Sequence, residues 1–233
     1  MNRSHLSPLA NIFNPLTRQE LNLRTAIHEA GHAAAIYLGN KHKQLPPVFF
    51  RIYINEPASR LQVPANSGKR QGNCMAEVEG GRLIHTLPSS IDMATRDFSS
   101  AQKQAYECAF DADIVNMLAG PLAEAKYIAQ RDDELINPGL VNPDSLHFYG
   151  GSSDLEATNE YLACFTADRE LRQKKMAELF LAAFNFVNNS WNWLAINALA
   201  DYILMQSKNI IECEEAIAVI NARFAAYWSP VKI

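Results

Sequence analysis

The amino-acid sequence predicts a mainly α protein of the α+β class, a helical bundle around one central helix with a small β-hairpin or short sheet. Apolar residues recur at helical spacing over most of the chain, whereas β-branched and aromatic residues cluster between 48 and 87. The helical segment 21–38 is rich in alanine. Neighbouring backbones can approach such a thin helix closely, so we expect it to be buried at the centre.

The N-terminal third is expected to hold the central helix and two strands. Thr17-Arg18-Gln19-Glu20 has the form of a capping box, which marks a helix start, and Gly39-Asn40 supplies a stop. Val48 to Ile54 fits a strand. Residues 55–71 contain two prolines with serine, asparagine and glycine and are typical of a loop. A second strand is expected within 73–87, and we predict no β structure elsewhere.

The remainder of the chain is predicted to be helical. Gly120-Pro121 should interrupt the helical pattern, so that the helix is kinked or restarts there, because proline removes a backbone hydrogen bond. A long loop follows, with Pro138, Pro143 and Gly150-Gly151. The expected helices are 101 to about 119, 122–130, 152 or 153 to about 187, a segment from 191 to 205 after the separator 188–190, and 207 to about 227.

Composition excludes several classes of partner. Twenty-one Lys and Arg against 25 Asp and Glu give a net charge of −4 without a long basic cluster, so neither nucleic acid nor a membrane is expected as a partner. The apolar runs fall short of the ~20 residues that span a bilayer. No secretory signal is recognisable, and the four cysteines lie far apart. We therefore expect a cytoplasmic protein with reduced thiols.

The central helix carries the motif His28-Glu29-Ala30-Gly31-His32, an H-E-x-x-H. Residues four apart lie ~40° apart around a helix and ~6 Å along it, so both imidazoles can meet one zinc ion. Glu29 is then placed to act as general base without ligating the metal. The alternative is a chance pair of core histidines, but burying them with a glutamate is costly unless a partner such as a metal satisfies them.

Catalytic zinc usually takes three protein ligands and a water, so a third ligand must come from elsewhere. A metzincin would continue with Gly and His where this chain has Ala35 and Leu38, which excludes that class. The third ligand must therefore be distant in the sequence.

Three motifs together resemble the peptidase domain of the FtsH-type ATP-dependent zinc proteases. His28-Glu29-Ala30-Gly31-His32-Ala33 matches the family's form of the zinc motif. Leu118-Ala119-Gly120-Pro121-Leu122-Ala123-Glu124 is similar to L-G-G-R-x-A-E-E, and residues 150–159 are similar to G-A-S-N-D-L-x-x-A-T-N. The resemblance implies a stand-alone, zincin-like peptidase domain over residues 17–228, an N-terminal extension 1–16 and a tail 229–233.

The resemblance also implies that Asp154 is the third zinc ligand. The residues alone favour another interpretation, in which Asp154 is a carboxylate in the first turn of a capped helix, where the helix dipole and free N–H groups stabilise it; the two other motifs shift the preference to a ligand. A different third ligand, Glu124, would give a gluzincin arrangement.

The chain departs from the family in several places. It has no G-x-x-x-x-G-K-[ST], so no AAA ATPase domain is expected; the nearest fragment is Ser67-Gly68-Lys69-Arg70. Pro121 stands for an arginine and Ala125 for the second glutamate. We hypothesise that Glu124 orients a zinc-binding histidine, since such imidazoles usually donate their other N–H to a carboxylate. A solvated helical glutamate is the alternative.

The expected activity is that of a zinc metalloendopeptidase with one ion per chain. A zinc-activated water would attack the scissile bond of peptides or unfolded proteins, with Glu29 as base. His85, His147 and Tyr149 are candidates for polarising the carbonyl, and the strands within 48–87 could pair with an extended peptide. A homo-oligomer or a separate ATPase is a possible partner. The alternative is a catalytically inactive domain that binds proteins or regulates a related complex.

Overall fold

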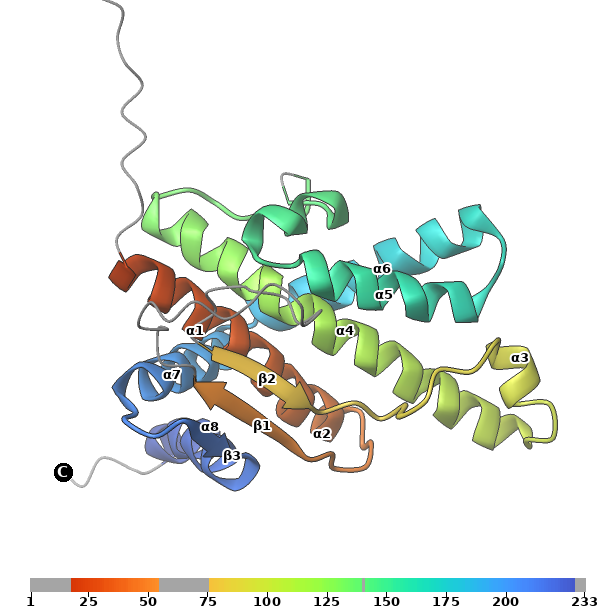
Figure 1. The fold of residues 1–233 in the computed structure, drawn as a ribbon, viewed down its shortest axis with the longest axis horizontal. Coiled ribbons are helices and arrows are strands. Elements are labelled where there is room, and N and C mark those ends of the chain that lie inside the picture. Colours follow the sequence, from red (N-terminus) through yellow and green to blue (C-terminus); the bar gives the residue numbers. More distant parts are fainter. Residues whose placement is uncertain (1–17, 55–75, 140, 229–233) are drawn as a thin grey trace, which may run out of the picture.

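The computed structural model describes residues 18–54, 76–139 and 141–228, and its described part is mainly helical with a small antiparallel sheet, as the sequence predicts (Figure 1). In chain order the elements are α1 (Arg18–Ala34), the π-helical turn η1 (Ala35–Gly39), α2 (Asn40–His42), β1 (Phe50–Ile54), β2 (Ala76–Gly80), α3 (Ile91–Ala94), α4 (Ser100–Arg131), the 3-10 helix η2 (Pro143–Tyr149), α5 (Ser152–Phe165), α6 (Arg169–Asn188), α7 (Ser190–Met205), β3 (Ile210–Glu212) and α8 (Cys213–Trp228).

Helix α1 is the central helix that the sequence predicts. It packs against α4 on one side and α7 on another, and β2 lies beside it (Figure 1). Its alanines at 26, 30, 33 and 34 are fully buried, as are Leu118, Ala119 and Ala123 on α4. The interface between α1 and α4, called the seam below, is therefore built largely from small buried residues.

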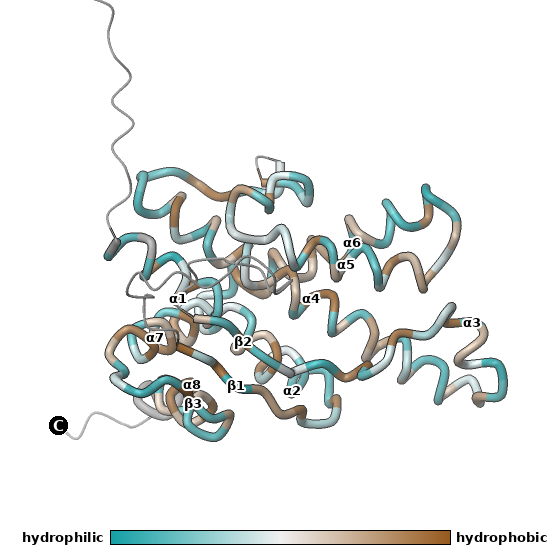
Figure 2. Tube along the Cα trace, viewed as in Figure 1, coloured by the Kyte–Doolittle hydropathy of each residue, from teal (hydrophilic) through white to brown (hydrophobic). Residues whose placement is uncertain are grey.

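The sheet places β1 between β2 and β3, and both neighbours run antiparallel to it. Phe50 and Ile52 are buried against the helices, and Figure 2 shows hydrophobic residues along β1. The N–H of Gly81 donates to the carbonyl of Phe49, which fixes the alternation of paired and unpaired residues along the ladder. Val78 opposite Ile52 falls at an unpaired position, so its N–H points away from β1 at the outer edge of the sheet.

Several predicted boundaries are wrong. The first helical segment does not stop at Gly39-Asn40 but continues through η1 to His42, and Gln44 then takes a left-handed φ of 55°. A π turn cannot be recognised from apolar spacing, because it inserts one residue into the helical repeat. The predicted capping box at Thr17 and the predicted loop 55–71 lie outside the described residues.

The expected interruption at Gly120-Pro121 is also absent, because α4 runs without a break from Ser100 to Arg131. Its middle is buried against α1 and α6, and this packing outweighs the one hydrogen bond that Pro121 removes. The single helix expected over 152–187 is instead two helices, since Asp168 caps α6 by accepting from the N–H groups of Glu170 and Leu171.

Strand β3 was not predicted, and α8 begins at Cys213 rather than near 207. β3 has only three residues, and its pairing partner β1 lies far away in the sequence. Such a strand forms because of tertiary pairing, which local propensity does not encode.

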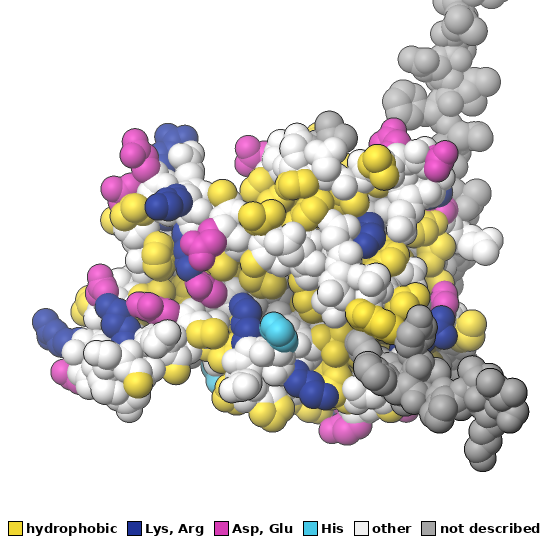
Figure 3. All heavy atoms as spheres, turned by 180° about the vertical axis from the view of Figure 1, so that it is seen from behind, with side chains coloured by type: hydrophobic (Ala, Val, Ile, Leu, Met, Phe, Trp, Pro, Cys, Tyr) yellow, Lys and Arg dark blue, Asp and Glu magenta, His cyan; other side chains and the backbone are white. Residues whose placement is uncertain are grey.

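The described surface does not indicate a particular function. Figure 3 shows acidic, basic and hydrophobic side chains interspersed on one face. Within the described ranges no helix is both long enough and apolar enough to cross a bilayer. Cys108, Cys164 and Cys213 are free thiols.

Lys126 provides a test of how the core is packed. Its side chain is buried on α4, Nζ donates to the carbonyl of Val187 at 3.0 Å and lies 4.5 Å from the centroid of the Trp193 ring. Burial lowers the pKa of Lys126 from 10.5 to about 8. Between these two values the unfolded chain binds more protons than the folded one, so this group makes the free energy of unfolding rise with pH.

We predict that this rise is missing in Lys126→Met. Urea denaturation between pH 7 and 10.5 should show the wild type gaining up to about 3 kcal/mol relative to the variant. Because the comparison cancels the other titrating groups, parallel pH profiles for the two proteins would contradict a buried ammonium at this site.

Candidate metal centre

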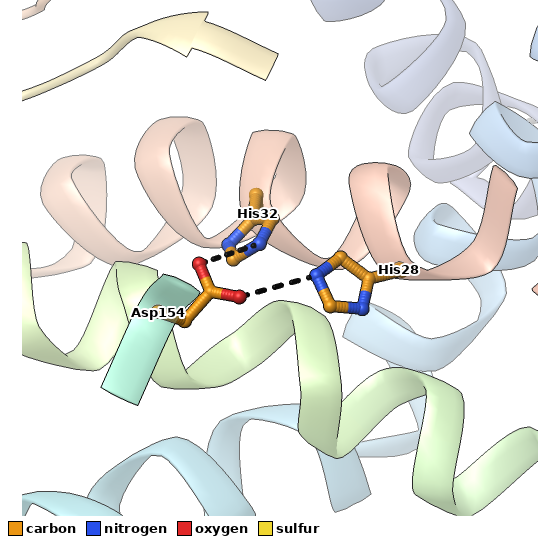
Figure 4. Close-up of side chains that lie close together, drawn as sticks. All are labelled: His28, His32 and Asp154. Atoms are coloured by element: carbon orange, nitrogen blue, oxygen red, sulfur yellow. Dashed lines mark ion pairs between the residues drawn. The ribbon is translucent and has the colours of Figure 1, made fainter. Parts of the chain in front are cut away.

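Three side chains from two helices converge on one point. His28 and His32 project from successive turns of α1, and Asp154 reaches them from the first turn of α5 (Figure 4). Nε2 of His28 lies 3.4 Å from Oδ2 of Asp154, and Nε2 of His32 lies 3.3 Å from Oδ1. The structure thus brings together the two histidines and the aspartate that the sequence and the resemblance single out.

The two separations go to different oxygens of Asp154, and both are longer than a typical charge-assisted hydrogen bond. Charge-assisted N–H···O bonds are usually ~2.7–2.9 Å long. A tetrahedral zinc ion with ligands at ~2.0–2.2 Å separates neighbouring ligand atoms by roughly 3.4 Å. Two imidazole nitrogens and a carboxylate oxygen are also a ligand set that zinc accepts, and all three ligand atoms lie within 4.8 Å of one another. The residues present therefore fit a zinc ion.

The second ring nitrogen of each histidine has a partner on α4. Nδ1 of His28 lies 3.1 Å from Oε2 of Glu124, and Nδ1 of His32 lies 2.8 Å from the backbone carbonyl of Asn116. Both partners are acceptors, so when the rings are neutral, as metal binding requires, they favour the tautomer with the proton on Nδ1 and the lone pair on Nε2. Glu124 therefore lies within hydrogen-bond distance of His28, as the hypothesis of an orienting carboxylate requires. It contacts the edge of the ring opposite to Asp154.

Glu124 is itself held in place by Arg24. The guanidinium donates from Nε and Nη2 to Oε1 of Glu124, at 2.8 and 2.5 Å, which leaves Oε2 for His28. Arg24 is not among the residues that the sequence motifs single out. Its position four residues before His28, on the same face of the helix, is the signal that could have identified it.

The charges of this cluster stabilise one another. Burial alone would raise the pKa values of Glu124 and Asp154, but contacts with the histidines, and for Glu124 also with Arg24, lower both below their ordinary values. Burial alone would lower the pKa of His28, but Asp154 and Glu124 outweigh it and raise the pKa well above 6.5. The two carboxylates therefore stay ionised.

Glu29 lies beside the ligands but faces the sheet. Its carboxylate is buried, and Oε2 accepts the outward N–H of Val78 at 2.7 Å. Burial raises the pKa of Glu29, while both histidines and the Val78 N–H oppose the rise. A base with a raised pKa, fixed by one hydrogen bond, is suited to taking up a proton.

A cleft with a volume of about 800 Å³ opens onto this cluster. His32 and Asp154 line one part of it, and the edge of β2 with Gly81, Arg82 and His85 lines another. His85 lies in the lining, whereas His147 and Tyr149 on η2 do not. Of the three residues suggested for polarising a carbonyl, the structure places only His85 at the cleft.

Comparison with protein-family models, with curated proteins and with solved structures gave no match. A functional proposal therefore depends on the geometry of the site and not on a matched protein.

We predict that Glu124→Gln weakens zinc binding by about 10- to 100-fold, as is usual when a carboxylate behind a ligating histidine is lost. The amide keeps the shape of the side chain but loses its charge and its ion pair with Arg24. Competition with a fluorescent zinc chelator measures the effect. Glu107→Gln, a half-exposed glutamate on the same helix, is the matched control and should bind zinc like the wild type; equal affinity of both variants would contradict the role assigned to Glu124.

Proposed function

We propose that this protein is a zinc-dependent metallopeptidase with a zincin-like site, in keeping with its resemblance to the peptidase domain of FtsH-type proteases. The observation that carries the proposal is the convergence of His28, His32 and Asp154, whose ligand atoms lie within 4.8 Å of one another, with Glu29 close enough to interact with all three. His28, His32 and Asp154 would hold the ion. Zinc bound there would lower the pKa of a water toward ~7 and polarise a carbonyl.

Residues of the chain would then carry out proton transfer and orient the two imidazoles. Glu29 takes the proton of the attacking water and delivers it to the leaving amine. The carbonyl of Asn116 and the Arg24–Glu124 pair keep both imidazoles oriented, so that their lone pairs need no reorganisation during turnover.

The outer edge of β2 supports a peptide as the substrate. Val78 and Gly80 both stand at ladder positions whose backbone groups point away from β1, and both line the cleft. Because the Val78 N–H donates to Glu29, the Val78 carbonyl and the backbone groups of Gly80 are the ones left for a substrate. An extended chain can pair with such an edge, and a compact folded protein cannot. We therefore propose peptides and unfolded segments as substrates; for compact proteins, a separate ATPase would have to supply the unfolding.

The role of Glu29 as the general base can be tested by removing its carboxylate. We expect Glu29→Gln to retain one zinc ion per chain and to lose hydrolysis of a fluorogenic peptide by about 10²- to 10⁴-fold, because only the proton acceptor is removed. Metal content and turnover are measured on the same zinc-loaded preparation. Glu77→Gln, an exposed glutamate on β2, is the control and should keep full activity.

Undiminished turnover in Glu29→Gln would rule out this mechanism. Zinc binding in a wild type that cleaves no peptide would instead favour the inactive binding module.

The hydrogen bond from the Val78 N–H to Glu29 can be tested separately. Val78→Pro deletes this donor and no ladder bond, because position 78 is unpaired toward β1, and edge strands tolerate proline there. We expect kcat to fall by about tenfold or more while the zinc affinity is unchanged. Val78→Ala retains the N–H and should keep kcat close to that of the wild type. A similar loss in both variants would mean that the side chain of Val78, not its N–H, matters.

A further inference from the structure

The wall of the cleft that contains residues 81–85 is shaped by a glycine turn. Gly80 and Gly81 take left-handed φ angles of 90° and 76°, and a Cβ at position 81 would lie 2.3 Å from Cδ1 of Ile36. Only glycine fits this combination of backbone angle and close packing. The turn directs the chain from the edge of β2 along the cleft.

A buried carboxylate anchors this segment. Asp113 on α4 accepts the N–H groups of Leu83 and Ile84 at 2.8 and 2.9 Å and the hydroxyl of Tyr161 at 3.0 Å. Its side chain is 1% exposed. The three donors satisfy the Asp113 charge and tie the segment to α4 and α5, so the neighbouring Arg82 is held at a preset place.

Arg82 is exposed and is the one Lys or Arg side chain in the lining of the cleft, as far as the described residues extend. Its guanidinium lies 5.8 Å from the Tyr161 ring centroid and interacts with the Tyr161 side chain and, electrostatically, with the buried Asp113 carboxylate. Among the ion pairs of the described residues, none joins Arg82 to an exposed carboxylate. Glu79 also lines the cleft, but it is paired in register with Arg51, and strand alternation turns both toward the solvent face of the sheet. Arg82 is thus the cationic side chain of the cleft that also contains His32 and Asp154, while the Asp113 carboxylate in the same lining is already held by its three donors.

We propose that Arg82 binds a carboxylate of the substrate, so that the enzyme prefers peptides with an anionic group a short distance from the scissile bond. This inference rests on the proposed peptidase function and names its substrate class. The planar guanidinium matches a carboxylate with two parallel N–H···O bonds. An aspartate or glutamate side chain and a free C-terminal carboxylate offer the same chemistry.

The experiment scans one fluorogenic parent peptide, amidated at its C-terminus, with glutamate or glutamine at each position in turn. A second arm compares the amidated peptide with the free acid. We expect one position, or the free C-terminus, at which the carboxylate raises kcat/KM by about tenfold, mainly through KM, because the contact is made in ground state and transition state alike. Since the contact is open to solvent, the preference should shrink at high salt.

Variants assign the preference to Arg82. Arg82→Gln should reduce the ratio of glutamate to glutamine peptide to about one, and Arg82→Glu should invert it in favour of lysine at that position. Arg96→Gln removes an exposed arginine that does not line the cleft and should keep the wild-type ratio. Zinc content should be the same in all of these variants, since Arg82 touches none of the ligands.

Binding to zinc-loaded Glu29→Gln, followed by fluorescence anisotropy of the same peptides, repeats the comparison without hydrolysis. A carboxylate preference that persists in Arg82→Gln, or no preference at any position, overturns the role of Arg82 while leaving the peptidase intact. Tenfold tighter binding of the carboxylate peptide without any cleavage by the wild type supports the Arg82 subsite and overturns the peptidase.

Discussion

The close contact between α1 and α4 is the constraint on which the site depends. A Cβ at Gly31 would lie 2.8 Å from the carbonyl oxygen of Ala119, and a Cβ at Gly120 would lie 2.2 Å from Nε2 of His32. The two helices approach this closely only because neither position carries a side chain. At a wider spacing, Asn116 and Glu124 on α4 would no longer reach Nδ1 of the histidines on α1.

Buried charge along this seam is compensated group by group. Glu124 is bound by Arg24 and His28, Glu29 by the N–H of Val78, and Asp113 by two backbone N–H groups and Tyr161. An unpaired carboxylate would be costly at each of these places, so the donors explain how several acids share one small region. The same contacts fix the walls of the cleft, because each joins two different elements.

The sequence contained the local part of this site but not the part made by tertiary contacts. His28, Glu29 and His32 follow from helical spacing within five residues, whereas Asp154 came from the resemblance and not from spacing. The groups contributed by Val78 and Asn116 belong to the backbone, so the identity of these residues carries no signal for them. The class of fold was predictable from apolar periodicity, but the π turn η1 and strand β3 depend on packing and on long-range pairing.

Pro121 shows why a departure from a motif is best judged in three dimensions. By itself it predicts a broken helix, but α4 continues through it, and a Cβ at Gly151 would lie 2.7 Å from Cβ of Pro121. Gly151 precedes α5 directly, and Asp154 lies in the first turn of that helix. The proline ring therefore packs against the start of the helix that carries Asp154, while the neighbouring Gly120 lies against His32. A residue that breaks the local helix rule thus packs where α4 contacts both parts of the candidate metal centre, and this packing holds the helix through Pro121.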